Sequence, residues 1–353
     1  MQSNGERRPA RMDDVAAAAG VSHQTVSRVL NGADSVRPET RARVLAAVER
    51  LGYRRNVAAR ALASRRSQTI GVLTAGTQLF GPTGILHGIE QAARQADYYL
   101  SIASEPVLEL AAVRRALARL TEQAVDGIVV VGPQEDAQGA LVELAERVPV
   151  VVVDGHAGPG PTRVYVDHLG GARAATAHLL EQGVRTVHHV AGPPDWGEAA
   201  DRRAGWEAVL REAGRAVPRP LAGDWSAGSG YAAGCLLAVD PEVEAVFVAN
   251  DQMALGVLRA MAEVGRRCPE DVLLAGFDDV PEAGFFWPPL TTVRQDFPAL
   301  GRASIDLLLQ GIAGGAVAGA AGGAGGSPRR EVAVPAQLVV RASSHRLPVP
   351  SSA

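Results

Sequence analysis

Three short stretches near the N-terminus place apolar residues at helical spacing. They span 12–19, 23–31 and 38–51, and a turn containing Gly20 separates the first two. Ser22 suits the N-cap of the second helix, and Pro38 suits the first position of the third. The pattern predicts three short helices.

The middle helix, 23–31, is divided into an apolar and a polar side. At 100° per residue one side collects Val26, Val29 and Leu30, and the other collects His23, Gln24, Ser27, Arg28 and Asn31. The apolar side can pack on its neighbours, while the polar side offers groups suited to base edges and phosphates. This arrangement predicts a helix-turn-helix; the alternative is a small three-helix bundle with a solvated polar face.

From residue 69 onward, short Val-, Ile- and Leu-rich runs alternate with helical stretches such as 106–124 and 251–264. The predicted strands are 69–74, 98–103, 126–131, 149–153, 186–190, 245–249, 272–277 and a final strand in EVAVPAQLVVR, 331–341. Continuous apolar strands with helical crossovers are typical of parallel sheets covered on both faces. The length of this region makes two doubly wound lobes the expected α/β architecture.

Polar residues follow several of these strands immediately. Asp154, Asn250 and Asp278 each come directly after a strand. Each alone is an ordinary cap or turn residue, but the carboxyl ends of parallel strands are where such sheets bind ligands. With Arg202, which can donate to two hydroxyls, and Trp225, which can stack on a sugar ring, they predict a sugar site.

Charge is distributed unevenly along the chain. Residues 1–66 contain 13 Arg against 6 acidic residues, whereas the whole chain carries a formal charge of −3. The basic part would attract a polyanion. No lysine occurs at all, which we interpret as a compositional habit of the source genome.

Composition sets the broad class. With 353 residues and 47% hydrophobic content, the chain can bury a large core. We expect no membrane span, no signal peptide, no cofactor and a cytoplasmic location. Cys235 and Cys268 match no metal or redox spacing, and His188 and His189 are interpreted as packing residues rather than a metal pair.

Several sequence motifs resemble those of the LacI family of bacterial regulators. DDVAAAAGVSHQTVSRVLNG and VRPETRARVLAAVERLGY resemble its DNA-binding head, and GDWSAGSGY, VANDQMALG and PPLTTVRQDFPALG resemble its sensor domain. The resemblance covers about residues 12–341 and is weaker between 75 and 150. It implies an all-α helix-turn-helix head and a two-lobed, type I periplasmic-binding-protein-like sensor with doubly wound parallel sheets.

The resemblance also implies roles in DNA binding. His23, Gln24 and Arg28 would read bases, and Thr25, Ser27 and Asn31 would mostly hold phosphate. A hinge, NVAARALAS, would fold on operator DNA and insert a leucine into the minor groove; an ordinary flexible linker is the alternative. Arg55 departs from the family pattern, where proline is common. The expected DNA-binding residues are Ser22, His23, Gln24, Thr25, Ser27, Arg28, Asn31, Asn56 and Leu62.

For the sensor, the resemblance implies a ring of sugar-binding groups with apolar walls. The expected residues are Asp154, Arg202, Asn250, Asp278 and Gln295 for hydroxyls, and Leu79, Pro82, Ile85, Trp225 and Phe297 for the walls. Glu198 joins them as a departure, because a serine is expected there, and it puts the sugar preference in doubt. A galactoside is the first choice of effector on this resemblance.

The expected domains are a head at 1–55, a hinge at 56–66, a sensor and dimerisation domain at 67–341 and a disordered tail at 342–353. The Gly/Ala-rich stretch 311–327 is expected to be a flexible loop, because so many glycines disfavour a helix. No leucine-heptad helix that could pair dimers into tetramers follows, so we expect a homodimer.

These features predict a repressor that releases a palindromic operator when a small sugar binds between the lobes. One alternative is a sugar-binding protein, exported or cytoplasmic, without a DNA-binding role. Another is a glycosidase using Asp278 and Asp279, but adjacent strand residues point to opposite faces and cannot flank one bond.

Overall fold

The computed structural model describes residues 10–30, 35–53, 66–75, 78–105, 108, 110–133, 137–155, 160–314 and 330–345 of the chain. The chain divides into two compact units, Met1–Ser67 and Gln68–Ala353. Each unit is described by itself. The N-terminal unit is called the head and the C-terminal unit the sensor.

The head contains three helices, α1 (Met12–Ala19), α2 (His23–Leu30) and α3 (Pro38–Leu51). The predicted caps are confirmed. The Ser22 hydroxyl accepts a hydrogen bond from the Thr25 amide at 3.2 Å, and Pro38 occupies the first turn of α3. Gly20 ends α1 in a left-handed conformation (φ 62°), which costs glycine little.

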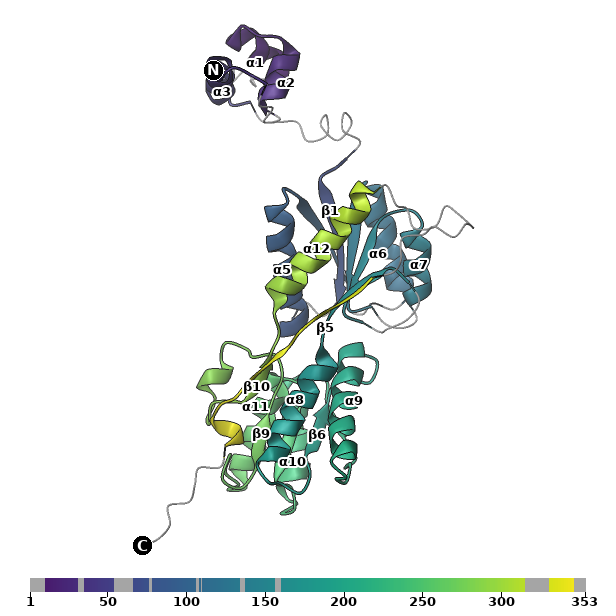
Figure 1. Ribbon diagram of the computed structural model, residues 1–353, viewed down its shortest axis with the longest axis vertical. Helices are drawn as coiled ribbons and strands as arrows, with labels where there is room; N and C mark the ends of the chain where they lie inside the picture. The colour runs from purple at the N-terminus through teal and green to yellow at the C-terminus, as the bar shows by residue number, and fades with distance from the viewer. Residues whose placement is uncertain are drawn as a thin grey trace, which may run out of the picture. The chain divides into compact units, whose positions relative to one another are not determined.

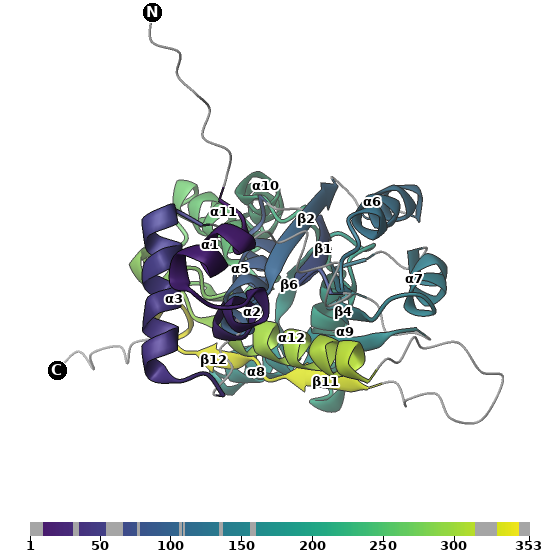
Figure 2. The same cartoon turned by 90° about the horizontal axis from the view of Figure 1, so that it is seen from above.

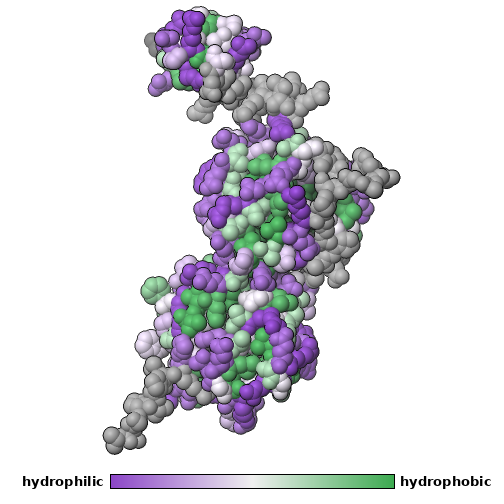
Figure 3. All heavy atoms as spheres, viewed as in Figure 1, coloured by the Kyte–Doolittle hydropathy of each residue, from purple (hydrophilic) through white to green (hydrophobic). Residues whose placement is uncertain are grey.

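A small apolar core holds the three helices together. Its buried members are Val15, Ala16, Ala19, Val26, Val29, Val44 and Ala47. Because α2 contributes Val26 and Val29 to this core, its opposite side faces solvent, and hydrophilic side chains predominate on the face of the head seen in Figure 3.

The sensor begins with a six-stranded parallel sheet, and this part is called the N-lobe (Figure 1). The strand order is β11-β5-β4-β3-β1-β2. The strands span β1 Thr69–Ala75, β2 Tyr99–Glu105, β3 Gly127–Val131, β4 Val150–Val153, β5 Thr162–Val166 and β11 Glu331–Val334.

Helices cover both faces of this sheet. One apolar cluster joins the sheet to α5 (Phe80–Gln95) and α12 (Phe297–Ala313), and another joins it to α6 (Leu110–Glu122) and α7 (Gln138–Ala145). Figure 2 shows the two helix pairs on different sides of the strands. The all-apolar strands β3 and β4 are buried along their whole length, as the Val-rich runs predict.

The second lobe, called the C-lobe, is built on a four-stranded parallel sheet of order β7-β6-β8-β9. The strands span β6 His188–Ala191, β7 Leu221–Ala222, β8 Ala245–Val248 and β9 Leu273–Ala275. Its helices are α8 His168–Glu181, α9 Gly197–Glu212, α10 Ala227–Ala238 and α11 Asp251–Glu263. A two-stranded antiparallel sheet, β10 (Thr292–Arg294) with β12 (Gln337–Val339), packs beside them.

The chain passes between the lobes after β5, after β10 and after β11. β5 leads from the N-lobe into α8, and β10 leads back into α12. The yellow C-terminal segment runs from β11 to β12 in Figure 1. Both sheets are doubly wound, so the carboxyl ends of their strands are the expected place for a ligand.

Two glycines set the spacing of α5 and α12. A Cβ on Gly88 would lie 2.2 Å from the carbonyl oxygen of Phe297, and a Cβ on Gly301 would lie 2.2 Å from the backbone of Gly88. Only the absence of side chains allows the two backbones to approach so closely.

The structure corrects three sequence predictions. Residues 311–313 continue α12 rather than starting the predicted loop, because the helix packs on the sheet. The predicted single strand 331–341 is two strands in different sheets, β11 and β12, interrupted at Pro335. The tail predicted to be disordered from 342 begins with a 3-10 helix, η3 (Ala342–Ser344), in which Ser343 and Ser344 are buried.

The strands β5, β7 and β10 were not among the sequence predictions. The hinge and most of the Gly/Ala-rich stretch, residues 54–65 and 315–329, lie outside the described residues. Within the described residues, no helix is long and apolar enough to span a membrane.

Candidate functional site

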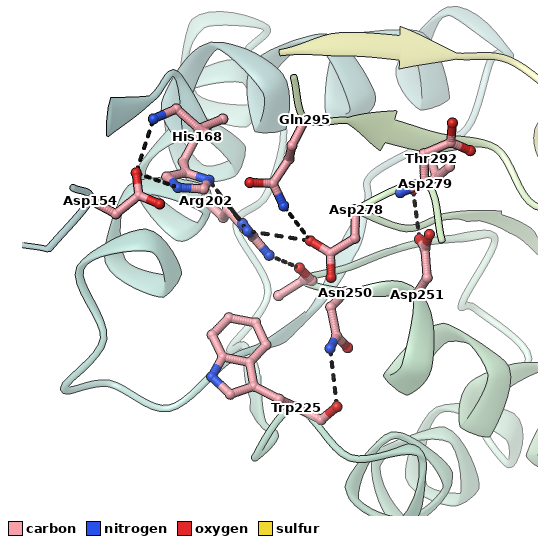
Figure 4. A network of polar contacts seen from close by, with 12 residues as sticks. Asp154, His168, Arg202, Trp225, Asn250, Asp251, Asp278, Asp279, Thr292 and Gln295 are labelled. Carbon is pink, nitrogen blue, oxygen red and sulfur yellow. Dashed lines mark hydrogen bonds and ion pairs between the residues drawn. The ribbon is translucent and has the colours of Figure 1, made fainter. Parts of the chain in front are cut away.

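Strand ends and helix starts of both lobes bring a chain of polar side chains together (Figure 4). Its members are Asp154, His168, Arg202, Asp278 and Gln295, and all five are buried. They come from the end of β4, the start of α8, the second turn of α9 and the segments that follow β9 and β10. Residues far apart in sequence therefore meet at one place.

Arg202 is the centre of this network and is only 4% exposed. Its Nη2 lies 3.6 Å from Oδ1 of Asp278, and its Nη1 donates to the carbonyl of Ala249. The guanidinium carbon lies 3.8 Å from the ring centroid of Phe277 and 5.4 Å from that of Trp225. The charge is thus held by an opposite charge and by aromatic faces.

His168 links Arg202 to Asp154. Its Nδ1 lies 3.4 Å from Nε and 3.3 Å from Nη2 of Arg202, and its Nε2 lies 3.4 Å from Oδ1 of Asp154. Because a guanidinium only donates, Nδ1 must accept, which places the ring proton on Nε2. Nε2 has no hydrogen-bond partner of good geometry among the described residues.

Asp154 is positioned by its backbone as well as its side chain. The Val166 amide donates to its carboxylate at 2.9 Å, and Arg163 donates to the carbonyls of Asp154 and Gly155 at 3.4 Å and 2.7 Å. Burial acts to raise the pKa of Asp154, but His168, the Val166 amide and Arg163 outweigh it and lower that pKa. Asp154 therefore keeps its negative charge.

Three of the predicted site residues have left-handed backbones that non-glycine residues rarely adopt. The φ angles are 57° at Asp154, 73° at Trp225 and 116° at Asp278. Such conformations cost on the order of 1–3 kcal/mol each and cluster at functional sites. Their position at strand ends, within one polar network, supports a ligand-binding role.

Asp278 is held by both neighbours in the network. Gln295 donates to its Oδ1 at 2.7 Å, and Nη2 of Arg202 lies 3.6 Å from the same oxygen. Burial raises the pKa of Asp278 to about 6, although Arg202, His168 and Gln295 act in the opposite direction. The carboxyl group is therefore close to the range in which it changes charge.

The following residue, Asp279, points to other partners and fixes the loop. Arg294 and Arg341 each donate to its carboxylate at 2.6 Å. Nearby, Asp251 accepts from the Thr292 hydroxyl at 2.6 Å and from the backbone amide that follows Asp279 at 3.0 Å. Burial raises the pKa of Asp251 well above its ordinary value. These contacts hold the loop that presents Asp278. Asp278 and Asp279 lie beyond β9 rather than, as predicted, within a strand, but their carboxylates contact different partners.

Trp225 lies just before α10 and is 6% exposed. Its carbonyl accepts from Asn250 Nδ2 at 3.0 Å, and its indole Nε1 has no partner among the described residues. A Cβ on Gly192 would lie 2.2 Å from the indole ring, so this glycine makes room for it. The ring of Trp196 meets the Trp225 ring edge-on, with centroids 5.9 Å apart.

A cavity opens against this network between the N-lobe and the C-lobe. Its volume is about 30 Å³, and its lining residues come from strand ends and helix starts of both lobes: Ala75, Gly81, Pro82, Ile85, Val131, Gly132, Asp154, His168, Trp196, Glu198, Arg202 and Gln295. A water molecule needs roughly 10–15 Å³ of such volume, so the cavity holds only a few waters.

Most of the predicted sugar-binding residues line this cavity or are linked to a residue that lines it. Pro82, Ile85, Asp154, Glu198, Arg202 and Gln295 line the cavity. Asp278, Trp225 and Asn250 do not, but they connect to Arg202 directly or through Trp225. Leu79 and Phe297 are half-buried and do not line the cavity; Leu79 packs against the apolar cluster that contains Trp225, and Phe297 packs against Phe80.

Sequence reasoning missed His168 and Trp196. His168 follows β5, a strand that was not predicted, so no strand end drew notice to it. Trp196 lies shortly after the predicted strand 186–190, and that position could have indicated it.

On the head, the predicted DNA-binding residues of α2 lie on its solvent side. Ser22, His23, Gln24 and Arg28 are exposed, and Thr25 and Ser27 are half-buried. Asn31, Asn56 and Leu62 lie outside the described residues.

His189 packs between two aromatic rings, and the neighbouring His188 is half-buried. The His189 ring stacks between Trp206 and Phe247, with centroids 5.1 Å and 5.0 Å away, and its Nδ1 lies 2.9 Å from the Phe247 carbonyl. Burial lowers the pKa of His189 to about 4 and also lowers that of His188. No group of three potential metal ligands occurs among the described residues.

Family models match both parts of the chain. "Bacterial regulatory proteins, lacI family" matches residues 11–56, and "Periplasmic binding protein-like domain" matches residues 176–344. The first match covers the three helices of the head, and the second covers nearly the whole C-lobe.

Individual relatives match over nearly the full length. The lactose operon repressor of Escherichia coli (strain K12) is 37% identical over 317 residues, covering 88% of this chain and 87% of that protein. A crystal structure of the lac repressor dimer bound to operator and the anti-inducer ONPF matches with a TM-score of 0.84 at 33% identity, covering 96% of this chain and 99% of that one. A complex of the transcriptional regulator CelR with cellobiose matches with a TM-score of 0.69 at 32% identity, covering 95% and 100%.

Proposed function

The chain belongs to the LacI family of bacterial regulatory proteins, and on that premise we propose that it represses transcription from an operator that it releases when a sugar binds in the sensor cavity. It acts in the cytoplasm, where the DNA lies. The single observation that carries the sugar response is the buried network from Asp154 to Gln295 at the ends of the sensor strands.

The head supplies DNA binding. His23, Gln24 and Arg28 stand exposed on α2, the helix that in a helix-turn-helix lies in the major groove. A guanidinium can fork onto guanine and a Gln amide can pair with adenine, each worth roughly 1–3 kcal/mol of discrimination. The excess of arginine over acidic residues in 1–66 supports phosphate binding.

The sensor supplies the response. The cavity lies between the two lobes, and residues of both lobes line it. Because Asp154 belongs to one lobe and Arg202 and Asp278 to the other, a sugar that bonds to all three selects one lobe arrangement. Operator affinity then changes by the coupling free energy, typically 1–3 kcal/mol.

A galactoside is the proposed effector class, by similarity to the lactose operon repressor. By the family resemblance, Asp154, Arg202, Asn250 and Asp278 would bind the hydroxyls, whereas Glu198 stands where a serine is expected.

We propose that the protein acts as a homodimer, as the matched lac repressor does. Phe285 and Trp287 are 90% and 94% exposed, although each has a large apolar surface. Other exposed apolar residues lie on β2, on α10 and its C-cap, and on α11: Tyr99, Ile102, Leu236, Val239 and Leu255. Exposed aromatic side chains can serve as interface residues, and we propose that Phe285 and Trp287 lie in the dimer contact. Trp287→Asp should convert a dimer to a monomer in sedimentation velocity.

The decisive experiment is a band-shift titration with the full chain and its own upstream DNA, in the absence and presence of a panel of sugars. We expect specific binding that falls steeply as salt rises, and release by a subset of sugars. Equal affinity for scrambled duplex would overturn the DNA-binding proposal. Specific binding that no sugar alters would overturn the sugar response alone.

A further inference from the structure

Two carboxylates, those of Asp154 and Glu198, line the cavity, and that of Asp278 lies next to it on Arg202. Among the described residues, side chains or backbone amides of other residues contact the carboxylates of Asp154 and Asp278 but not that of Glu198. Asp278 has Arg202 at 3.6 Å and Gln295 at 2.7 Å. Asp154 has the Val166 amide at 2.9 Å and His168 at 3.4 Å.

Glu198 is different. It lies in the first turn of α9, is half-buried and lines the cavity. No other described residue makes a hydrogen bond or an ion pair with its carboxylate, and His168 and Arg202 act on it only from a distance. Burial first, and the negative charge of Asp154 second, raise the pKa of Glu198.

An aromatic ring lines the same cavity as Glu198. Trp196 caps α9 two positions before Glu198, lines the same cavity and meets Trp225 edge-on. Indole faces attract cations by about 0.5–2 kcal/mol, and a carboxylate beside aromatic rings is suited to an ammonium group.

Resting on the proposed sugar response, we propose that the effector is an amino sugar whose protonated amino group binds at Glu198, between Asp154 and the Trp196 ring. A hydroxyl would donate one hydrogen bond to Glu198 and leave its repulsion from Asp154 in place. An ammonium group donates three hydrogen bonds and places a positive charge between the carboxylates of Glu198 and Asp154. The network of Arg202, Asp278 and Gln295 remains for the hydroxyls.

The test compares matched sugars by isothermal titration of the full-length protein near pH 6.5, where such amines are protonated. The sugars are galactose, galactosamine and N-acetylgalactosamine, together with glucose, glucosamine and N-acetylglucosamine. We expect an amino sugar to bind at least about tenfold more tightly than its neutral and N-acetylated counterparts. The same order should appear in operator release.

Glu198→Gln keeps the shape of the side chain and removes the charge, so it should reduce this preference to about twofold or less. Glu198→Ser serves as a second variant if the first folds poorly. Glu122→Gln, an exposed position on α6 outside the cavity, is the matched control and should keep the preference.

Two outcomes would overturn the proposal while the sugar response stands. One is neutral sugars that bind as tightly as amino sugars. The other is Glu198→Gln protein with an unchanged preference. If no sugar of either kind bound or released DNA, the proposed sugar response would fail, and this inference with it.

Discussion

Arg202 on α9 and Asp278 after β9 form a buried ion pair, with Nη2 and Oδ1 3.6 Å apart and both residues about 95% buried. The pair lies in the middle of the network that continues through His168 to Asp154. Its two members come from separate strand–helix units of the C-lobe, so the pair forms only when those units pack together.

The first prediction concerns this pair. Arg202→Gln or Asp278→Asn alone should destabilise the protein by about 3–5 kcal/mol, because each leaves a buried charge without its partner. The double variant should cost less than the sum by about 0.5–3 kcal/mol, measured by urea unfolding.

The coupling should also depend on pH. The pKa of Asp278 in the folded protein is raised to about 6, so the carboxyl group loses its charge as pH falls through that value. The coupling should therefore be large at pH 8 and small at pH 5. The same coupling at both pH values would contradict the assignment.

The second prediction concerns Gly192 and Trp225. Gly192→Ala places a Cβ 2.2 Å from the indole ring and should displace it, weakening sugar release at least tenfold while operator binding stays. Gly139→Ala on α7, where nothing lies within 4 Å, is the control and should change neither. Trp225→Ala should likewise abolish release, and loss of operator binding instead would mark Trp225 as purely structural.

The third prediction concerns the exposed side of α2. Arg28→Ala should weaken operator binding by roughly 1–3 kcal/mol, or about 5- to 150-fold. Gln24→Ala should change which operator variant is preferred in a competition band shift. Sugar affinity should be the same in both variants, because neither residue belongs to the sensor unit. An unchanged operator preference would show that Gln24 contacts no base.

The fourth prediction concerns acid stability. Burial between Trp206 and Phe247 lowers the pKa of His189 from 6.5 to about 4, so the folded state favours the neutral ring. Its stabilising contribution is present above pH 6.5 and is lost as pH falls through about 4, and it amounts to about 3 kcal/mol at most. His189→Leu should flatten the fall of unfolding free energy between pH 6.5 and 4. An equally steep fall would assign the acid sensitivity to other groups.

Much of this architecture follows from the sequence by local rules. Ser22, Pro38 and Gly20 mark helix ends because capping depends on groups a few residues away. The Val-rich runs predict buried parallel strands because both faces of each strand must be apolar. Because each apolar run marks where a strand ends, the sequence also predicts that Asp154, Asn250 and Asp278 lie at strand ends.

Only the tertiary structure decided how these pieces meet. Residues 331–341 resemble one strand locally, yet they divide at Pro335 between two sheets. β11 pairs with β5, which lies over a hundred residues earlier in the chain, and β12 pairs with β10. The left-handed backbone at Asp154 and the place of His168 beside Arg202 likewise depend on distant neighbours.

The carboxylate of Glu198, which has no hydrogen-bond or ion-pair partner among the other described residues, is a further example. Whether a buried carboxylate has a partner depends on which other charges the fold brings near it, and electrostatic energy depends on distance in space rather than along the chain. The sequence determined the elements and the edge of the sheet where polar groups gather. The fold determined which of those groups neutralise one another and which remain for a ligand.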